Sequence, residues 1–367
     1  MADRSSAPDR KVIRPAALVV GVDTQDPRRP LEPELAEFEA LIDAAGATVL
    51  ERIVQRRAHV DPATLIGSGK AAEIGERAKE LGAAVVMVLN DLRPRQRKNL
   101  EKMIAVPIVD RTMLILDVFA RHARSREGKL QVELAQLRYR QSNLIGVGAD
   151  LSRLGGGIGT RGPGETKLEV DRRRIAQRIS LLGRQLEDVR RQRATRREAP
   201  RDEPLAALVG YTNVGKSSLL NRLARSSAFV ADQPFATLDP TMRQVYLAPR
   251  TFVRVVDTVG FITDLPKDLI NAFRATLEEL QEADLLIHVV DASNPDWPRQ
   301  MQAVDRTLQD LDLASKARIV VYNKTDAPHG ELPTGSSALL VSAKTGAGID
   351  ALKEELTRMS GRWAHVT

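Results

Sequence analysis

The sequence predicts an α/β fold in which a doubly wound sheet is preceded by a small α/β subdomain and a long helical hairpin. Two observations predict this fold. Short apolar runs alternate with stretches of helical periodicity near both ends of the 367-residue chain, as they do where strands and helices alternate around a parallel sheet. Between these regions the chain is highly charged and its apolar residues recur every three to four positions, which is typical of long amphipathic helices.

Residues 1–112 are predicted to form the N-terminal α/β subdomain. Three apolar runs in this region are typical of strands, and two longer stretches have helical periodicity. Their alternation favours a small parallel sheet. The strand-like runs are residues 17–22, 85–89 and 107–109, and the helical stretches are residues 33–45 and 70–81.

Residues 113–198 are predicted to form a helical hairpin. Its second helix, from residue 165 to about 197, is rich in arginine and carries a single apolar stripe. We expect this stripe to pack against the first helix near Leu130, Leu134 and Leu137, and the arginines to face solvent or a partner. The stripe consists of Ile175, Ile179, Leu182 and Leu186, and the arginines are Arg172, Arg173, Arg174, Arg190, Arg191 and Arg193.

A glycine-rich loop, residues 155–164, joins the two predicted helices and has two interpretations. It is longer than a helical hairpin needs, so it is either a flexible turn or a tip that touches RNA. In the second interpretation the glycines let the backbone approach nucleic acid, and Arg153, Arg161 and Lys167 contact phosphates.

The C-terminal piece is predicted to form one doubly wound sheet over residues 205–361. A linker with two prolines at 199–204 precedes it, and a short tail at 362–367 follows. Its length suits a single α/β domain. Strands are predicted at 205–209, 252–256, 285–290, 319–322 and 339–341, and helices at 217–224, 269–282 and 349–358.

A glycine-containing loop, G-Y-T-N-V-G-K-S, follows the first of these strands and opens a helix. Backbone N–H groups at a helix N-terminus can hold phosphate oxygens, so this context meets the requirement of a phosphate-binding P-loop. Lys216 is predicted to neutralise the β- and γ-phosphates, and Ser217 to bind Mg²⁺. The predicted nucleotide contacts of the loop are Gly210, Tyr211, Thr212, Asn213, Val214, Gly215, Lys216, Ser217 and Ser218.

Two further segments are predicted to sense the γ-phosphate. Asp257-Thr258-Val259-Gly260 ends the next long strand, where the carboxylate can reach the Mg²⁺ shell and the Gly260 amide can reach the phosphate. A loop bracketed by two prolines should supply a threonine ligand for Mg²⁺, and both Thr237 and Thr241 are candidates. The predicted nucleotide contacts of this loop are Phe235, Ala236, Thr237, Leu238 and Asp239, and the predicted catalytic residues are Lys216, Thr237 and Gly260.

The tetrapeptide Asn323-Lys324-Thr325-Asp326 follows a strongly apolar run and identifies the base as guanine. The Asp326 carboxylate can accept hydrogen bonds from guanine N1–H and N2–H, whereas adenine would leave this charge unpaired. Ser342, Ala343 and Lys344 follow the last short strand and are expected to contact guanine O6 through their backbone. In this order along the chain, the motifs predict a P-loop GTPase domain that binds GTP or GDP with Mg²⁺.

The charge of the chain is divided unevenly. The net charge is +7, but residues 205–367 hold 17 Lys/Arg and 19 Asp/Glu, so the positive excess lies in residues 1–204. A polyanion such as RNA suits a basic surface, and a solvated face is the other interpretation. The chain has no cysteine, which excludes thiolate chemistry and disulfides. It also has no signal-peptide core and no run of about 18 apolar residues, so we expect a cytoplasmic protein without a membrane anchor.

Three segments outside the nucleotide motifs carry a family resemblance. They are Leu65-Ile-Gly-Ser-Gly-Lys70, the stretch Arg-Glu-Gly-Lys-Leu-Gln-Val-Glu-Leu-Ala-Gln-Leu at 126–137, and Leu154-Gly-Gly-Gly-Ile-Gly-Thr-Arg-Gly-Pro-Gly-Glu165. With them, the chain resembles the HflX family of ribosome-associated GTPases over nearly its whole length.

This resemblance implies an N-terminal domain that docks on the large ribosomal subunit and its rRNA, a GTPase domain that controls docking, and a role in splitting stalled or idle ribosomes. It implies that Thr237, rather than Thr241, binds Mg²⁺. Met242 departs from the family pattern, in which a second threonine is usual. We expect a monomer, and no further C-terminal domain after Thr367.

Two hypotheses concern hydrolysis. The position after the Asp-x-x-Gly motif is Phe261, which cannot orient water as a glutamine does, so we expect slow intrinsic hydrolysis and stimulation by the ribosome. Asn213 either holds a potassium ion beside the phosphates or is an ordinary loop asparagine, and equal rates in potassium and sodium buffers would favour the second. The alternative function is an RNA-binding factor for ribosome assembly or hibernation, in which GTP is only a structural ligand.

Overall fold

The computed structural model describes residues 14–26, 29–154, 163–197, 203–226, 233–263, 279–332 and 338–363. The chain divides into two compact units, Met1–Leu114 and Ile115–Thr367. The first unit ends close to the expected end of the N-terminal subdomain at residue 112. The division of the second unit into a hairpin, a linker and a C-terminal domain stays a prediction.

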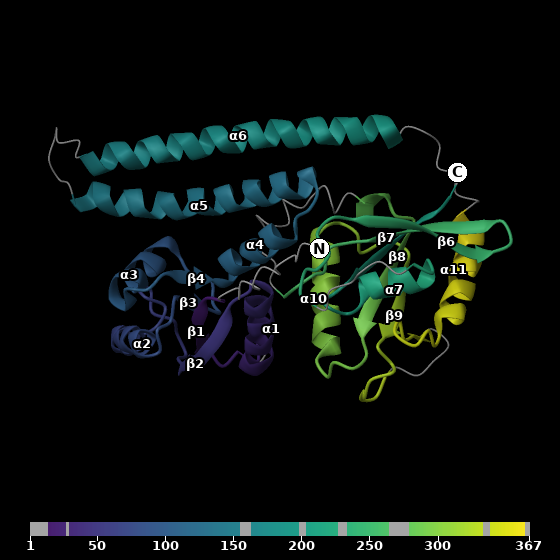
Figure 1. The fold of residues 1–367 in the computed structure, drawn as a ribbon, viewed down its shortest axis with the longest axis horizontal. Helices are drawn as coiled ribbons and strands as arrows, with labels where there is room; N and C mark the ends of the chain where they lie inside the picture. The colour runs from purple at the N-terminus through teal and green to yellow at the C-terminus, as the bar shows by residue number, and fades with distance from the viewer. Residues whose placement is uncertain are drawn as a thin grey trace, which may run out of the picture. The chain divides into compact units, whose positions relative to one another are not determined.

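The first unit is a four-stranded parallel sheet with helices on both faces (Figure 1). Its elements are β1 (Ala16–Asp23), α1 (Leu31–Ala44), β2 (Thr48–Arg56), α2 (Ser68–Glu80), β3 (Val85–Val88), α3 (Pro94–Ile104) and β4 (Ile108–Asp110), and the strand order is β2-β1-β3-β4. The predicted strands and helices are confirmed. β2 and α3 were not predicted, because β2 is an edge strand with only Ile53 buried and α3 buries little apolar surface besides Leu100 and Ile104.

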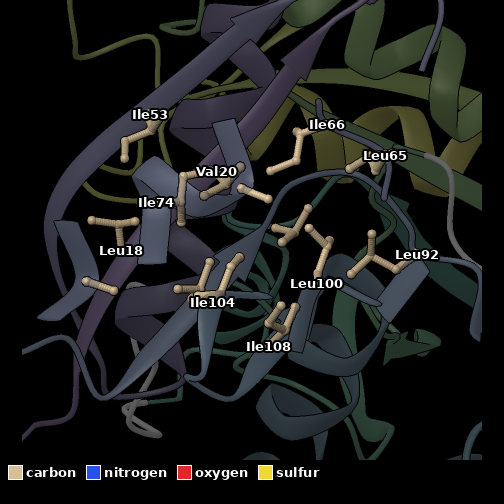
Figure 2. Packing of buried hydrophobic residues seen from close by; sticks show 14 of the residues in the cluster. Leu18, Val20, Ile53, Leu65, Ile66, Ile74, Leu92, Leu100, Ile104 and Ile108 are labelled. Atoms are coloured by element: carbon tan, nitrogen blue, oxygen red, sulfur yellow. The ribbon is translucent and has the colours of Figure 1, made fainter. Parts of the chain in front are cut away.

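The side chains of β1 alternate between the two faces of this sheet, as the pleat requires. Leu18, Val20 and Val22 pack with residues of α2 and α3, including Ile74 and Leu100, in one buried cluster (Figure 2). On the opposite face, Gly21 lies next to Leu35 of α1, because a Cβ added to this glycine would be 3.6 Å from the Leu35 side chain. A strand covered on both faces is buried along almost its whole length.

Three helices follow the first sheet. They are α4 (Arg111–His122), α5 (Arg126–Leu154) and α6 (Pro163–Arg197). The sequence predicted continuous helical character from residue 113, but the structure interrupts it before Ser125, whose Oγ accepts a hydrogen bond from the Gly128 N–H at 2.8 Å and caps α5. Although α5 and α6 are long, no helix among the described residues is apolar enough to cross a membrane.

The helices α5 and α6 lie side by side as the predicted hairpin (Figure 1). Leu134 of α5 is buried against Leu182 and Leu186 of α6, with Leu130, Leu137 and Ile179 at the edge of this cluster. Arg178 of α6 and Glu133 of α5 form an ion pair at 2.7 Å beside the cluster. The apolar stripe of the second helix therefore packs as predicted.

The second unit also contains a six-stranded sheet with the strand order β10-β9-β8-β5-β7-β6. All of its strand pairs are parallel except β6 with β7. The elements are β5 (Leu205–Gly210), α7 (Lys216–Leu223), β6 (Thr241–Ala248), β7 (Thr251–Asp257), β8 (Leu285–Asp291), α10 (Trp297–Asp310), β9 (Arg318–Asn323), β10 (Leu339–Leu340) and α11 (Ile349–Trp363). The predicted doubly wound sheet is confirmed.

One strand of this sheet and one helix between its strands in the sequence were not predicted. β6 lies at the sheet edge and has only Val245 buried, and α10 is mostly polar with Val304 and Leu308 buried. The helix predicted at 269–282 lies mostly outside the described residues. The buried strands β5 and β8 end on the same side of the sheet because they are parallel neighbours, and the candidate site forms there.

Candidate nucleotide-binding site

The phosphate-binding loop connects β5 to α7. Two of its residues have left-handed backbone conformations, Asn213 with φ of 61° and Gly215 with φ of 90°. A Cβ at Gly215 would collide with the Asn323 amide, so glycine is required for this close approach. The loop and the first turn of α7 line a hollow of about 160 Å³ that is partly open to solvent.

Lys216, at the start of α7, is the buried cation of this hollow. Only 6% of the residue is exposed, and its Nζ donates hydrogen bonds to the carbonyl oxygens of Gly210 at 3.1 Å and Tyr211 at 2.8 Å. Burial lowers the pKa of Lys216 to about 8, and the nearby Asp257 carboxylate opposes this shift. Carbonyl partners compensate a buried charge only partly, so an anionic phosphate in the hollow would favour the charged lysine.

Three oxygen-bearing side chains meet beside Lys216. Ser217 Oγ lies 2.7 Å from Thr237 Oγ1 and donates to Asp257 Oδ2 at 2.5 Å. The Oδ1 atom of Asp257 is buried and has no hydrogen-bond partner among the described residues. Burial raises the pKa of Asp257, and the Lys216 ammonium opposes the shift.

These oxygens fit a divalent cation. Mg²⁺ prefers carboxylate, hydroxyl and water oxygens, and a buried acceptor without a partner is a group that a cation or its bound water would satisfy. Of the two candidate threonines, the structure places Thr237 in this cluster. Thr241 begins β6 and is exposed.

The segment after β7 is attached to the phosphate-binding loop through its backbone. The Phe261 N–H donates to the Gly210 carbonyl at 3.0 Å, and the Thr212 N–H donates to the Phe261 carbonyl at 2.8 Å. Gly260 therefore lines the hollow directly against the loop, where a Cβ added to it would lie 2.9 Å from Thr212 Cα. The Phe261 side chain is buried, with 3% exposed, and offers no polar atom to a water molecule.

The second end of the site lies at the carboxyl end of β9. Asn323 is buried, and its Nδ2 donates to the Val214 carbonyl at 2.9 Å while its Oδ1 accepts the Ala343 N–H at 3.0 Å. Asn323 therefore connects the phosphate-binding loop with the loop that follows β10. Lys324 extends over the phosphate-binding loop, where its Nζ donates to the Asn213 carbonyl at 2.8 Å and pairs with Asp291 at 2.7 Å.

Asp326 is the carboxylate predicted to recognise the base. Ser342 Oγ donates to Asp326 Oδ1 at 2.6 Å, and Lys344 Nζ lies 3.9 Å from Oδ2. The hydrogen bond from Ser342 lowers the pKa of Asp326, so the carboxylate is ionised near neutral pH. An ionised carboxylate accepts hydrogen bonds only, as recognition of the two N–H groups of guanine requires.

The structure brings most of the predicted site residues together. Among the described residues that line the hollow, only Gln233 was not predicted; it precedes Pro234, one of the two prolines that bracket the loop. Asp291 was also missed, since it reaches Lys324 through the pairing of β8 with β9 rather than through sequence proximity. Besides Gln233, the hollow is lined by Thr212, Asn213, Gly215, Lys216, Ser217, Ser218, Phe235, Ala236, Thr237, Thr258, Gly260 and Lys324.

Some predicted contacts lie elsewhere. Leu238 is buried in the protein, with 1% exposed, and Asp239 accepts hydrogen bonds from residues that precede α5. Neither residue lines the hollow. Tyr211 points its hydroxyl to Thr263 Oγ1 at 2.7 Å.

The predicted arginine-rich face belongs to α6. Arg172, Arg173, Arg174 and Arg191 are exposed. Two of these arginines form ion pairs within the helix, Arg174 with Asp171 at 4.0 Å and Arg191 with Glu187 at 3.9 Å. The side chains of Arg190 and Arg193 and most of the glycine-rich loop, with Arg161, lie outside the described residues, as do the side chains of Arg153 and Lys167.

Three family profiles match consecutive parts of the chain. They are described as "GTP-binding GTPase N-terminal" over residues 32–120, "GTP-binding GTPase Middle Region" over residues 122–199 and "50S ribosome-binding GTPase" over residues 205–324. The last match contains the phosphate-binding loop and ends at Lys324.

Relatives and a solved structure extend this similarity. The chain is 47% identical to "GTPase HflX" of Lacrimispora saccharolytica, covering 93% of this chain and 82% of the relative. It is 44% identical to "GTPase HflX" of Escherichia coli K12, covering 91% and 81%. A crystal structure described as the complex of SsGBP and GDP shares the fold, with a TM-score of 0.51, 22% identity and coverage of 96% of this chain and 99% of its own.

Proposed function

The chain belongs to the HflX family of GTPases, and from this premise we propose that it binds the large ribosomal subunit in its GTP-bound state and splits stalled or idle ribosomes. The observation that carries this proposal is the match of residues 205–324 to a family described as a 50S ribosome-binding GTPase. The exposed arginines of α6 support rRNA as the surface that is contacted. We also propose that the protein is cytoplasmic and monomeric.

The chain hydrolyses GTP as its family does, and we assign the nucleotide contacts from the geometry of the site. Lys216 neutralises the β- and γ-phosphates, and the loop from Gly210 to Ser217 surrounds them. Asp326 and the backbone after Ser342 read the guanine base, while Asn323 holds the two ends of the site together. These roles rest on the hydrogen bonds of Lys216, Asn323 and Asp326.

Ser217 and Thr237 are the residues proposed to hold Mg²⁺, with Asp257 beside them in the surrounding shell. The ion would supply positive charge that neutralises the phosphate oxygens during hydrolysis. Thr237 belongs to a loop rather than to a helix or strand, so it can leave the cluster when the γ-phosphate is lost. This movement would make binding of the large subunit depend on the nucleotide.

The residue after the Asp-x-x-Gly motif, Phe261, is the reason for proposing that hydrolysis depends on the ribosome. Its buried ring cannot position an attacking water molecule, and its backbone is hydrogen-bonded to the phosphate-binding loop. The site therefore lacks at this position the amide with which many GTPases orient water. We propose that contact with the ribosome supplies the missing catalytic group.

Sedimentation of ribosomes tests the proposal. Purified ribosomes are mixed with the protein and a non-hydrolysable GTP analogue and separated on a density gradient, with GDP and the variant Lys216→Ala as controls. We expect the protein to migrate with large subunits and the peak of intact ribosomes to fall, with the analogue only. If the protein binds large subunits equally with either nucleotide and leaves intact ribosomes unchanged, the alternative role in assembly or hibernation is favoured.

A further inference from the structure

The loop that carries Thr237 is attached to the first helix of the hairpin. Asp239 accepts three hydrogen bonds there, from the Arg124 N–H at 3.0 Å, from the Ser125 N–H at 2.7 Å and from the Ser125 hydroxyl. Ser125 is also the cap of α5, because its Oγ accepts the Gly128 N–H at 2.8 Å. A carboxylate at this end of a helix is favoured by the helix dipole and by N–H groups that have no partner within the helix.

Gly128 lets Asp239 come this close. A Cβ added to Gly128 would lie 2.5 Å from Asp239 Oδ1 and 3.2 Å from Ser125 Oγ. Glycine costs helix stability within a first turn relative to alanine. The close approach gives a physical reason for a glycine in this turn of α5.

A second contact holds the other side of the same loop. Phe235 packs on Phe119 of α4 with ring centroids 4.5 Å apart, and both rings are buried. Phe235 has a left-handed backbone with φ of 57°, which is unusual for an aromatic residue and needs support from its surroundings. Thr237 lies between these two attachments and reaches Ser217 with its hydroxyl.

We propose that Ser125 and Gly128 are positioning residues for GTP hydrolysis, because they hold Asp239 and thereby keep Thr237 at the Mg²⁺ and γ-phosphate site. This inference rests on the role assigned to Thr237 under the proposed function. Fixing a loop costs conformational entropy. The two attachments order the loop before GTP binds, so less of this entropy is lost on binding. The hairpin thus acts on the catalytic loop through the first turn of α5.

Single-turnover GTP hydrolysis without ribosomes tests the inference in the full chain. Gly128→Ala should lower the rate by about tenfold, the change that about 1.4 kcal/mol of lost positioning produces. It should weaken binding of a GTP analogue but leave GDP affinity within about twofold, because Thr237 contacts only the triphosphate state. Gly183→Ala in α6 is the matched control, since a Cβ there meets nothing within 4 Å, and it should change neither quantity.

Two further comparisons separate positioning from a general loss of structure. Ser125→Ala should reproduce the defect in GTP-analogue binding. Ser125→Thr should bind the analogue as the wild type does, because threonine keeps the hydroxyl that contacts Asp239 and Gly128. In a Thr237→Ala background, Gly128→Ala should cause no further loss of GTP-analogue affinity. The inference would be overturned if Gly128→Ala lowered GTP-analogue affinity equally with and without Thr237. It would also be overturned if GDP and GTP-analogue affinity fell in parallel. Since no ribosome is present, failure of ribosome binding leaves this result unaffected.

Discussion

At the scale of single residues, selection of guanine depends mainly on one carboxylate, that of Asp326. Ser342 donates to Asp326 Oδ1 and lowers the pKa of Asp326, so the carboxylate is ionised and accepts hydrogen bonds only. Guanine offers two N–H donors at this edge, whereas xanthine has a carbonyl in place of the amino group. An amide side chain could donate to that carbonyl and accept from the neighbouring N–H.

Asp326→Asn should therefore change the preferred base from guanine to xanthine. We expect GTP affinity to fall by roughly 100-fold or more and xanthosine triphosphate to bind more tightly than GTP, since a site built for particular hydrogen bonds rejects a ligand that leaves them unmade. Competition against a fluorescent nucleotide measures both affinities. Asp310→Asn, at the end of α10 and away from the site, is the matched control and should leave the preference unchanged. Loss of both nucleotides together would contradict the assignment.

The individual site residues show how far sequence reasoning reaches. Residues in contiguous motifs, such as Lys216 and Asn323, could be predicted because each motif carries its own geometry. Asp291 could not, because its contact with Lys324 depends on which strands are neighbours. The outward turn of Asp239 toward Ser125 also escaped prediction, since these residues are far apart in the sequence.

At the scale of elements, the central strand β8 carries a buried histidine. His288 is 1% exposed, and its Nδ1 has no hydrogen-bond partner among the described residues. Burial lowers the pKa of His288 to about 4, Arg318 lowers it further, and Asp305 partly opposes the shift. The imidazole of His288 is therefore neutral in the folded protein near neutral pH.

The free energy of unfolding should consequently fall on acidification. The folded pKa lies below the unfolded value of about 6.5, so the unfolded chain binds the proton more readily and the stabilisation is lost as pH falls from about 6.5 towards 4. Between pH 7 and 5 the contribution of His288 is about 2 kcal/mol. Chemical denaturation of the wild type and His288→Phe measures it, because the variant should lack this part of the pH dependence.

The raised pKa of Asp257 acts in the opposite direction, so only the difference between wild type and variant isolates the histidine. His329→Phe, at an exposed position, serves as the control and should keep the wild-type slope. An unchanged slope in His288→Phe would show that this imidazole does not titrate differently in the folded state.

The elements themselves were predictable where their pattern is strong. Apolar runs gave β1, β5 and β8, and the stripe from Ile179 to Leu186 gave the packing of α6 on α5. The edge strands β2 and β6 were missed because solvent contact on their exposed positions weakens the apolar signal. The break between α4 and α5 was also missed, and Ser125 caps α5 directly after it.

At the scale of the whole molecule, the nucleotide site and the basic hairpin belong to one functional account. The positive charge of the sequence is concentrated before residue 205, whereas the sheet with the nucleotide site is nearly balanced in charge. Asp239 and Phe235 connect the loop around Thr237 with α5 and α4. A partner that binds the hairpin can therefore influence hydrolysis through residues that the structure describes.

The rate of GTP turnover with and without purified large ribosomal subunits measures whether the ribosome stimulates hydrolysis. Because the buried Phe261 ring cannot orient water, we predict slow turnover by the protein alone and an increase of about 100-fold or more with large subunits, since partner proteins that supply a missing catalytic group stimulate other GTPases strongly. Small subunits at the same concentration provide the control and should have little effect. Equal turnover with and without large subunits would contradict the account.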